Sequence, residues 1–345
     1  MIKLVVDAFG GDDAPLEVIK GCKLALEEYD DIEIVLTGSE DEIKKCAKDN
    51  NISLDKMTIV NANSVIPVTE DPTKILKEYR DSSMAVGMEL VAKGEGDAFI
   101  SAGSTGAIVV GGSLIVKRLK GIKRAAIGTV LPCKNGHYML MDAGGNSDCR
   151  PEMLVQFAVM SSAYMMGVLG KENPKVALVN IGAEETKGLD LQVEAYKLLK
   201  KAPVNFIGNI EARYIPLGGC DIAVCDGFTG NVILKLTEGL AKYLGGEIKT
   251  MLLSSLKTKI GALFIKNGFN EFKSKLDYKE MGGAPLLGLT KPVIKAHGSS
   301  DARAFKNAIR QARLCVMGDV PQKIATSLAD IKAKAESSQQ LTEEN

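Results

Sequence analysis

The chain has 345 residues, and its 43 basic and 43 acidic side chains give a formal net charge of zero. A neutral chain has no overall field to attract nucleic acid, so an anionic partner must meet a local patch. Hydrophobic residues make up 46% of the chain, which excludes a disordered protein, and the low aromatic content without tryptophan argues against a base-stacking surface.

Short apolar runs rich in Val, Ile and Leu alternate with amphipathic stretches along the chain. The apolar runs predict strands at 3–6, 33–36, 58–60, 98–100, 126–131, 138–141, 175–180, 205–207 and 222–225. The stretches between them predict helices at 15–29, 40–50, 74–93, 107–120, 152–169, 189–201, 230–250 and 302–316. This alternation favours a three-layer α/β/α fold with a mainly parallel sheet.

No linker rich in proline, glycine or serine divides residues 1–334, so we expect one two-lobed α/β domain there. The polar residues 335–345 predict a disordered tail. The chain opens with the pattern of a strand rather than of a signal peptide. The uncharged stretches 99–116 and 153–170 are short for a membrane span and contain small polar residues, so we expect buried helices and no transmembrane protein.

The cysteine pattern indicates a reduced protein. Seven cysteines are scattered along the chain, and none belongs to a C-x-x-C pair. With only two histidines available, no spacing typical of a metal site is present. We therefore predict free thiols, a cytoplasmic location and no metal.

Polar, glycine-rich loops follow six of the predicted strands. Because ligands of parallel α/β sheets bind beyond the carboxyl ends of strands, these loops predict one convergent polar floor. None matches the phosphate loop of nucleotide enzymes or the dinucleotide fingerprint. They instead favour a cradle of backbone N–H groups, hydroxyls and amides for a small oxyanion such as phosphate. The predicted ligand contacts are Asp7, Gly10, Gly11, Asp12, Ser101, Gly103, Ser104, Thr105, Gly106, Asp142, Gly144, Asn146, Asn180, Asn209, Asp226, Gly227, Thr229, Gly230, Ser299 and Ser300.

Lys187 and His297 are the most reactive polar side chains near these loops. Lys187 is either an anion ligand or an ordinary solvated charge. His297, followed by Ser299 and Ser300 before the last predicted helix, is either a structural histidine or an anion contact and proton carrier. No serine lies in a G-x-S-x-G motif, so a covalent intermediate is not favoured.

Taken together, the loops resemble the phosphate acyltransferase family of bacterial phospholipid synthesis. The matching segments are 7–15, 80–87, 101–107, 142–146, 206–213, 226–235, 282–288 and 294–301, with Ser104 where the family commonly has Asn. The resemblance implies a fold similar to the isocitrate and isopropylmalate dehydrogenases and the phosphotransacetylases. It also implies a homodimer and no cofactor.

The reaction implied by the resemblance joins an acyl group to phosphate. Phosphate attacks the thioester of an acyl carrier protein directly, and the thiolate leaves. In this scheme Lys187 and Asn231 hold phosphate and the oxyanion with help from His297. Asp7, Asp12 and Asp142 orient loop N–H groups, because bare carboxylates repel phosphate.

Three alternative functions remain open from the sequence. The first is a coenzyme-A-linked phosphate acetyl- or butyryltransferase, with the same chemistry and another donor. The second is a metal- and NAD-dependent decarboxylating dehydrogenase, which shares only the implied fold. The third is a non-catalytic scaffold that docks lipid enzymes at a membrane.

Segment 242–279 is the one strongly basic stretch, with eight lysines and three acidic residues. Its leucines fall on one helical stripe flanked by lysines, as in helices that lie on membranes. The alternatives are a core-facing helix and a surface for the acidic carrier protein. Since a long-chain acyl phosphate suits direct delivery to a membrane acyltransferase, we expect a protruding helical pair that binds anionic membranes. The expected membrane contacts are Leu256, Ile260, Leu263 and Phe264.

Overall fold

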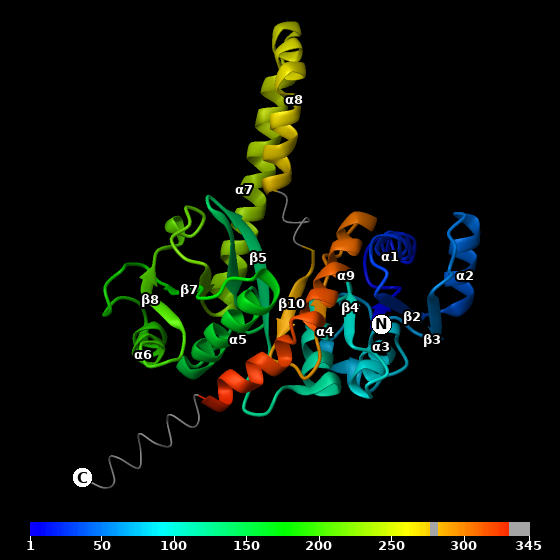
Figure 1. Ribbon diagram of the computed structural model, residues 1–345, viewed down its shortest axis with the longest axis horizontal. Coiled ribbons are helices and arrows are strands. Elements are labelled where there is room, and N and C mark those ends of the chain that lie inside the picture. The colour runs from blue at the N-terminus through cyan, green and yellow to red at the C-terminus, as the bar shows by residue number, and fades with distance from the viewer. Residues whose placement is uncertain (277–281, 331–345) are drawn as a thin grey trace.

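One continuous sheet of eleven strands runs through the computed structural model, which describes residues 1–276 and 282–330 (Figure 1). In spatial order the strands are β3 (Met57–Asn61), β2 (Ile32–Gly38), β1 (Ile2–Asp7), β4 (Ala98–Ser101), β11 (Val293–Lys295), β10 (Ala284–Leu287), β5 (Ala126–Cys133), β6 (Gly136–Met141), β9 (Ile222–Val224), β7 (Lys175–Val179) and β8 (Asn205–Ile210).

The sheet is mixed at its centre and parallel in its two halves. Within the described residues, seven of the ten pairings between neighbouring strands are parallel, which agrees with the predicted mainly parallel sheet. Strand β10 is antiparallel to both of its neighbours, and β5 is antiparallel to β6. As a result, strands β6 to β9 run opposite to β1, β2, β3, β4 and β11. The carboxyl ends of the strands in the two halves therefore point to opposite edges of the sheet.

Helices cover both faces of the sheet because alternate strand residues point to opposite sides. The helices are α1 (Leu16–Glu28), α2 (Glu40–Asp49), α3 (Ser83–Ala92), α4 (Thr105–Gly111), α5 (Pro151–Leu169), α6 (Asp190–Leu199) and α9 (Ala302–Met317). Val6 packs in a core with α1, α5 and α9, whereas its neighbour Val5 packs in a second core with α3 and α4. A third core lies on the other face of β6, β7 and β9.

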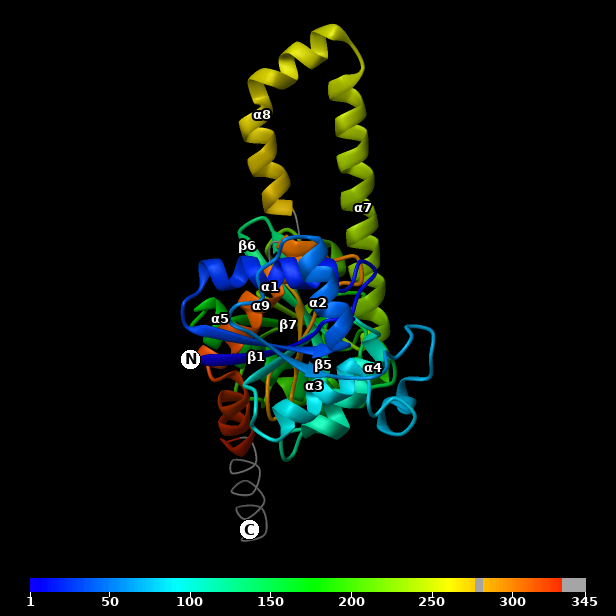
Figure 2. The same ribbon diagram turned by 90° about the vertical axis from the view of Figure 1, so that its right-hand side faces the viewer.

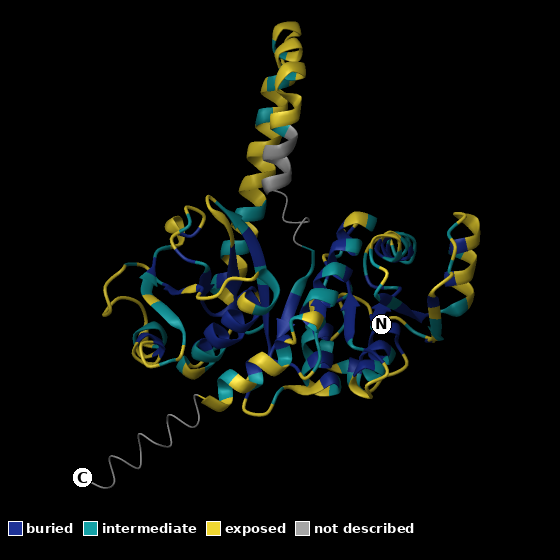
Figure 3. Cartoon of the chain, in the orientation of Figure 1, coloured by how far each residue is buried: buried dark blue, intermediate teal, exposed yellow. Residues whose placement is uncertain are grey.

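Helices α7 (Gly227–Leu253) and α8 (Leu256–Leu276) extend away from the sheet (Figures 1 and 2). At about 1.5 Å per residue, the 27 residues of α7 span roughly 40 Å. Along α7 only Gly227 and Gly230 at its start are buried, and Figure 3 shows the outer part of the pair as mostly exposed.

Two predicted helices end differently in the structure. The predicted helix at 74–93 is two elements, a 3₁₀ helix at Pro72–Leu76 and α3, because the Ser82 hydroxyl accepts from the N–H of Ala85 and starts a new helix. The predicted helix at 107–120 is α4 followed by a π-helical segment, Gly112–Lys117. The prediction also missed β10 and β11, which are short and lie at the centre of the sheet. The predicted tail at 335–345 and residues 277–279 of the basic segment lie outside the described residues.

Helix α5 is, among the described residues, the one helix long and apolar enough to cross a membrane. In its most apolar window 61% of the residues are buried inside the protein. Phe157 and Tyr164 of this helix are fully buried against the sheet. It is therefore a core helix by its packing, as expected for the stretch 153–170.

Candidate active site

The first part of the site lies where β1, β4 and β11 end side by side. The Asp7 carboxylate accepts a 2.7 Å hydrogen bond from the Ser101 hydroxyl, and that hydroxyl accepts from the N–H of Gly103 at 3.0 Å. Burial raises the pKa of Asp7, although these hydrogen bonds oppose it. Gly10 fits above them because a Cβ there would lie 2.7 Å from the Ser101 oxygen and 2.8 Å from Asp7. These contacts fix the loops after β1 and β4 to each other.

The loop after β11 joins this group. The N–H of Asp12 donates to the carbonyl of Gly298 at 2.8 Å, so the Gly10–Asp12 turn and the His297 loop are held together. The Nδ1 atom of His297 accepts from the N–H of Ser299 at 3.2 Å, which places the proton of the neutral ring on Nε2. Burial, then Lys295 and Lys235, lower the pKa of His297, so the imidazole is neutral at neutral pH and can donate through Nε2.

Ser104 and Ser300 have local structural roles beside this group. The Ser104 hydroxyl accepts from the N–H of Ala107 and caps α4, and Thr105 is exposed on the first turn. Ser300 is buried and donates its N–H to the carbonyl of His297 at 3.0 Å. Gly106 packs against Pro72, while Gly11 lies close to Gly298.

The second part of the site is built around Asp142 at the end of β6. This buried carboxylate accepts from the N–H groups of Ile127, Gly144 and Gly145 and from the Asn146 amide, at 2.8 to 3.2 Å. Burial raises the pKa of Asp142, and the hydrogen bonds oppose that shift. Its acceptor capacity is taken up by the protein, so Asp142 orients the loop rather than facing a ligand.

Helix α7 starts directly on this loop. Asp226 caps the helix by accepting from the N–H and the hydroxyl of Thr229, at 2.9 and 2.7 Å. Gly227 and Gly230 pack against the backbone of Asn146 and Asp142, where a side chain would overlap the loop. Asn231 follows and is exposed, and a Cβ built on Gly144 would lie 3.5 Å from its side-chain oxygen. Its amide is free to face a ligand over the Gly144 turn.

Helix α7 also connects the two parts of the site. Lys235 and Glu238, one and two turns after Asn231, lie close enough to His297 to shift its pKa in opposite directions. Lys235 forms an ion pair with Glu238 at 2.8 Å. Leu234 packs in the same core as Val5 and Val293. Helix α7 thus runs from the second group of loops, where Asn231 lies, to the first group, which Leu234 and Lys235 approach.

The third group of predicted residues lies around Lys187. The amide of Asn180 donates to the carbonyl of Lys187 at 2.9 Å, and the amide of Asn209 donates to the carbonyl of Glu184 at 2.8 Å. These two side chains shape the loop after β7. Lys187 itself is exposed, and in the described part of the chain no hydrogen bond or ion pair links its ammonium to Asn231 or His297. Helix α7 therefore links the Asn231 turn to the His297 loop through Lys235, and Lys187 lies on the loop after β7.

Lys295 is a residue at the site that sequence reasoning missed. It ends β11 and pairs in register with Ser101. Burial first, and Lys235 second, lower its pKa to about 8. The signal available in the sequence was a lysine directly after Val293-Ile294, at the end of an apolar run and two residues before His297.

Burial makes six of the seven cysteine thiols poorer nucleophiles. Burial raises the pKa of the thiols of Cys22, Cys46, Cys149, Cys220, Cys225 and Cys315. A thiol that stays protonated is a poor nucleophile. Among residues 1–276 and 282–330, no group of three or more His, Cys, Asp or Glu side chains could hold a metal ion.

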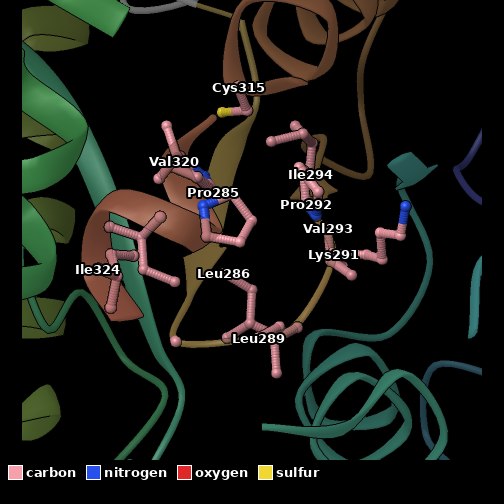
Figure 4. A pocket seen from close by; sticks show the side chains of 13 residues that line it. Pro285, Leu286, Leu289, Lys291, Pro292, Val293, Ile294, Cys315, Val320 and Ile324 are labelled. Carbon is pink, nitrogen blue, oxygen red and sulfur yellow. The ribbon is translucent and has the colours of Figure 1, made fainter. Parts of the chain in front are cut away.

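A separate pocket lies away from these loops (Figure 4). It is lined by apolar residues of the β10–β11 hairpin, such as Leu286 and Val293, and by Cys315, Val320 and Ile324 from the C-terminal helical segment. Lys291 and Pro292 place it at the amino end of β11, opposite Lys295. None of the predicted site residues lines this pocket.

Comparison with known proteins decides the family. The family model described as "Fatty acid synthesis protein" matches residues 2–323. A phosphate acyltransferase of Clostridium botulinum is 47% identical over 328 residues, covering 95% of this chain and 98% of that protein. The chain belongs to the phosphate acyltransferase family. Another relative, the phosphate acyltransferase of Thermoanaerobacterium thermosaccharolyticum, is 48% identical over 319 residues, covering 92% and 94% of the two chains.

Membership of the phosphate acyltransferase family makes the chain an acyltransferase, with phosphate as the acceptor that the family name gives. This confirms the predicted family and enzyme class, and it removes the dehydrogenase and the non-catalytic scaffold from the alternatives. Solved structures agree on the fold. A phosphotransacetylase from Streptococcus pyogenes superposes with a TM-score of 0.61 at 19% identity, covering 94% of each chain. The EutD phosphotransacetylase from Staphylococcus aureus gives 0.59 at 18% identity, covering 93% and 94%.

Proposed function

We propose that this phosphate acyltransferase moves a fatty acyl group from the thioester of acyl carrier protein to inorganic phosphate, giving acyl phosphate for phospholipid synthesis. The observation that carries the proposal is the course of α7, which starts with Asn231 beside the Gly144 turn and brings Lys235, one turn later, within electrostatic reach of His297 and the half-buried Lys295. Hydrogen-bond donors dominate this arrangement, and none of the shifted thiols is activated. It suits positioning and charge stabilisation of an anion.

The proposed chemistry is direct attack. A phosphate oxygen forms a bond to the thioester carbonyl carbon, and the carbonyl oxygen becomes an oxyanion. The oxyanion collapses, the carbon–sulfur bond breaks and the thiolate leaves with the electron pair. Because a thiol has a pKa of about 8.5 by analogy with cysteine, the leaving group needs little acid assistance. Asn231 and Lys187 stabilise the phosphate and the oxyanion, and the Nε2–H of His297 assists.

The site assignment is tested by alanine substitution. Lys187→Ala and Asn231→Ala should each lower turnover by roughly a hundredfold or more, because each removes a donor to developing charge. Both side chains are exposed, so folding should survive. Lys197→Ala is a matched control, since Lys197 is an exposed lysine that pairs with Glu194 on α6. Near-normal turnover in both site variants would show that the site is elsewhere.

The donor is tested by substrate comparison. Purified protein should form a hydroxylamine-trappable acyl phosphate from phosphate and a long-chain acyl carrier protein, with release of free carrier protein. The same acyl group on coenzyme A should react more slowly. Equal or faster reaction with the coenzyme A thioester would favour the coenzyme-A-linked alternative. No acyl phosphate from any donor would contradict the proposed function itself.

We also propose that the enzyme is cytoplasmic and docks on anionic membranes through α8. Four of its apolar side chains are exposed: Leu256 is 79% exposed, Ile260 57%, Leu263 72% and Phe264 87%. The lysines at 257, 259 and 266 lie among these side chains, and their ammonium groups would meet lipid phosphates. A surface of this kind releases a long-chain product next to a membrane acyltransferase.

Liposome flotation tests the membrane proposal. The wild type should bind vesicles with anionic lipid, and binding should weaken with salt. The double variant Leu256→Glu/Leu263→Glu should lose most binding while keeping its turnover with a soluble donor. Leu217→Glu is the matched control, because Leu217 is an exposed leucine on the body of the protein, at 59%. Undiminished binding by the double variant would refute the proposal.

The third part of the proposal is a homodimer, which is the assembly implied by the family resemblance. Sedimentation equilibrium at micromolar protein should give twice the chain mass of 36.8 kDa. A mass of one chain across that concentration range would contradict it.

A further inference from the structure

Asp7, Ser101 and Lys295 form a row across three neighbouring parallel strands. Ser101 pairs in register with Lys295 of β11, and Asp7 follows the register pair Val6–Ile100 on the other side. Val5, Phe99 and Val293, two residues earlier on each strand, all pack in the core with α3 and α4. Because side chains alternate along a strand, the three polar residues point to that same face. The row therefore presents a carboxylate, a hydroxyl and an ammonium at one end of the sheet.

The two charged ends of the row, Asp7 and Lys295, differ in their hydrogen-bond partners. The carboxylate of Asp7 accepts from Ser101 and from the N–H of Phe9. The ammonium of Lys295 donates to the carbonyl of Ala296, and among the described residues no carboxylate lies within ion-pair distance of it. An ammonium has three donors, and withdrawing a charge from water is costly unless it is paired; Lys295 is half-buried. Lys295 thus has donors to spare and no counter-charge in contact.

The surroundings of Lys295 favour an anion. Lys235 approaches from α7 and adds positive potential, and His297 follows two residues later with a donor at Nε2. The acidic groups within electrostatic reach are Asp12, from the loop after β1, and Glu238, which is paired with Lys235. A small dianion entering between α7 and the strand ends would supply the missing partner.

We propose that the ammonium of Lys295 binds the phosphate acceptor, holding it by a charge-assisted hydrogen bond at the end of the Asp7–Ser101–Lys295 row. This inference rests on the proposed function and names the residue that receives its acceptor. The same contact would hold the phosphoryl group of the acyl phosphate product. Lys235 and His297 support the anion from the side, and Ser101 and Asp7 fix the strand ends from which Lys295 projects.

The assignment predicts how phosphate affinity depends on pH. Burial and Lys235 bring the pKa of Lys295 to about 8 in the free protein, while Asp12 acts in the opposite direction. As pH rises through 8, more of the free protein carries a neutral amine at Lys295. Phosphate binding then includes the free-energy cost of protonating that amine, so the affinity falls. Inorganic phosphate is predominantly the dianion from pH 8 upward, so above pH 8 its affinity should fall through the titration of the protein.

Phosphate binding to the full chain, measured by titration calorimetry without acyl donor at pH 7 to 9, tests the assignment. Lys295→Met should weaken phosphate binding about ten- to hundredfold, because a charge-assisted hydrogen bond is lost. Its melting temperature should not fall, since methionine replaces a half-buried charge with an apolar chain of similar length. Lys295→Arg keeps a permanent charge and should bind phosphate with an affinity that no longer falls above pH 8. Lys291→Met, two residues before the start of β11 and paired with Asp97, is the matched control.

Two results would overturn the assignment: unchanged phosphate affinity in Lys295→Met, or no phosphate binding by the wild type. If Lys295→Met does not fold, the pH profile of Lys295→Arg decides, and a fall in affinity equal to that of the wild type overturns the assignment. The proposed function fails by a different result, which is the absence of acyl phosphate when the wild type receives donor and phosphate. If the wild type forms acyl phosphate and Lys295→Met binds phosphate unchanged, the proposed function stands and the role assigned to Lys295 is wrong.

Discussion

Gly230 decides how closely α7 can approach the loop after β6. A Cβ at this position would overlap the carbonyl oxygen of Asp142, and that backbone cannot move without breaking the hydrogen bonds that Asp142 holds. Gly230→Ala should lower the free energy of unfolding by about 1–3 kcal/mol and reduce turnover, since Asn231 moves with the helix. Urea unfolding and the acyl phosphate assay measure both effects.

Gly239 provides the control for that substitution on the same helix. Nothing lies within 4 Å of a Cβ built there. Gly239→Ala should therefore raise the free energy of unfolding by about 0.5–1 kcal/mol, the usual gain for alanine inside a helix, and leave turnover unchanged. If both variants behave alike, the close approach at Gly230 is not what constrains the site.

His297 gives a pH-dependent stability with a definite sign. Its pKa in the folded chain is below the ordinary value of 6.5, mainly through burial. The unfolded chain therefore binds more protons just below pH 6.5, and folding loses stability as pH falls through that window. His297→Gln removes this loss, so its free energy of unfolding relative to wild type should increase from pH 7.5 to 5.5. A difference that stays constant with pH would contradict the shift.

The sequence revealed the residues that shape the loops of the site, such as Asp142 and Gly144, but it did not reveal Lys295. Asp142 and Gly144 are recognisable because turn chemistry favours aspartate and glycine after a strand. Lys295 was missed because its significance comes from the neighbours Ser101 and Lys235, which are distant in the chain and meet only in the folded sheet. Lys187 was singled out by its loop, and its role as an anion ligand stays a prediction that the Lys187→Ala variant tests.

At the scale of elements, the start of α7 fixes the position of Asn231. Asp226→Ala removes the N-cap and should cost about 0.5–2 kcal/mol of unfolding free energy while lowering turnover. Ser39→Ala removes the cap of α2, which accepts from the N–H of Glu42 far from the site. It should lower stability within the same range and leave turnover intact. Equal turnover in the two variants would show that the cap does not position Asn231.

Elements with long periodic patterns could be predicted from the sequence, and short or divided ones could not. The outer strands and the helices α1, α2, α5, α6 and α9 fall near their predicted positions because their apolar spacing is regular. Strands β10 and β11 span four and three residues, which is too short for a period to appear. The break at Ser82 carried a signal, since Asp-Ser-Ser is a typical helix start inside an otherwise helical pattern.

At the scale of the whole molecule, the two halves share one sheet through β10 and β5. The order of strands depends on pairings between distant segments, so the sequence could not show that the halves run in opposite directions. A shared sheet predicts that the halves unfold together. Hydrogen exchange in rising urea should show the amides of β1 and β7 losing protection at the same concentration. Separate midpoints would indicate two independent lobes.

The central claim is that phosphate attacks the acyl donor directly, without an acyl-enzyme. The decisive measurement is to incubate the protein with a thioester labelled in its acyl chain, first without phosphate and then with it, and to measure label on the denatured protein. Because burial raises the pKa of the thiols of Cys149 and Cys225 near the Asp142 loop, we predict no bound label in the first step. Acyl phosphate should appear only when phosphate is added. Stoichiometric label on the protein before phosphate is added, discharged by phosphate as acyl phosphate, would contradict direct attack.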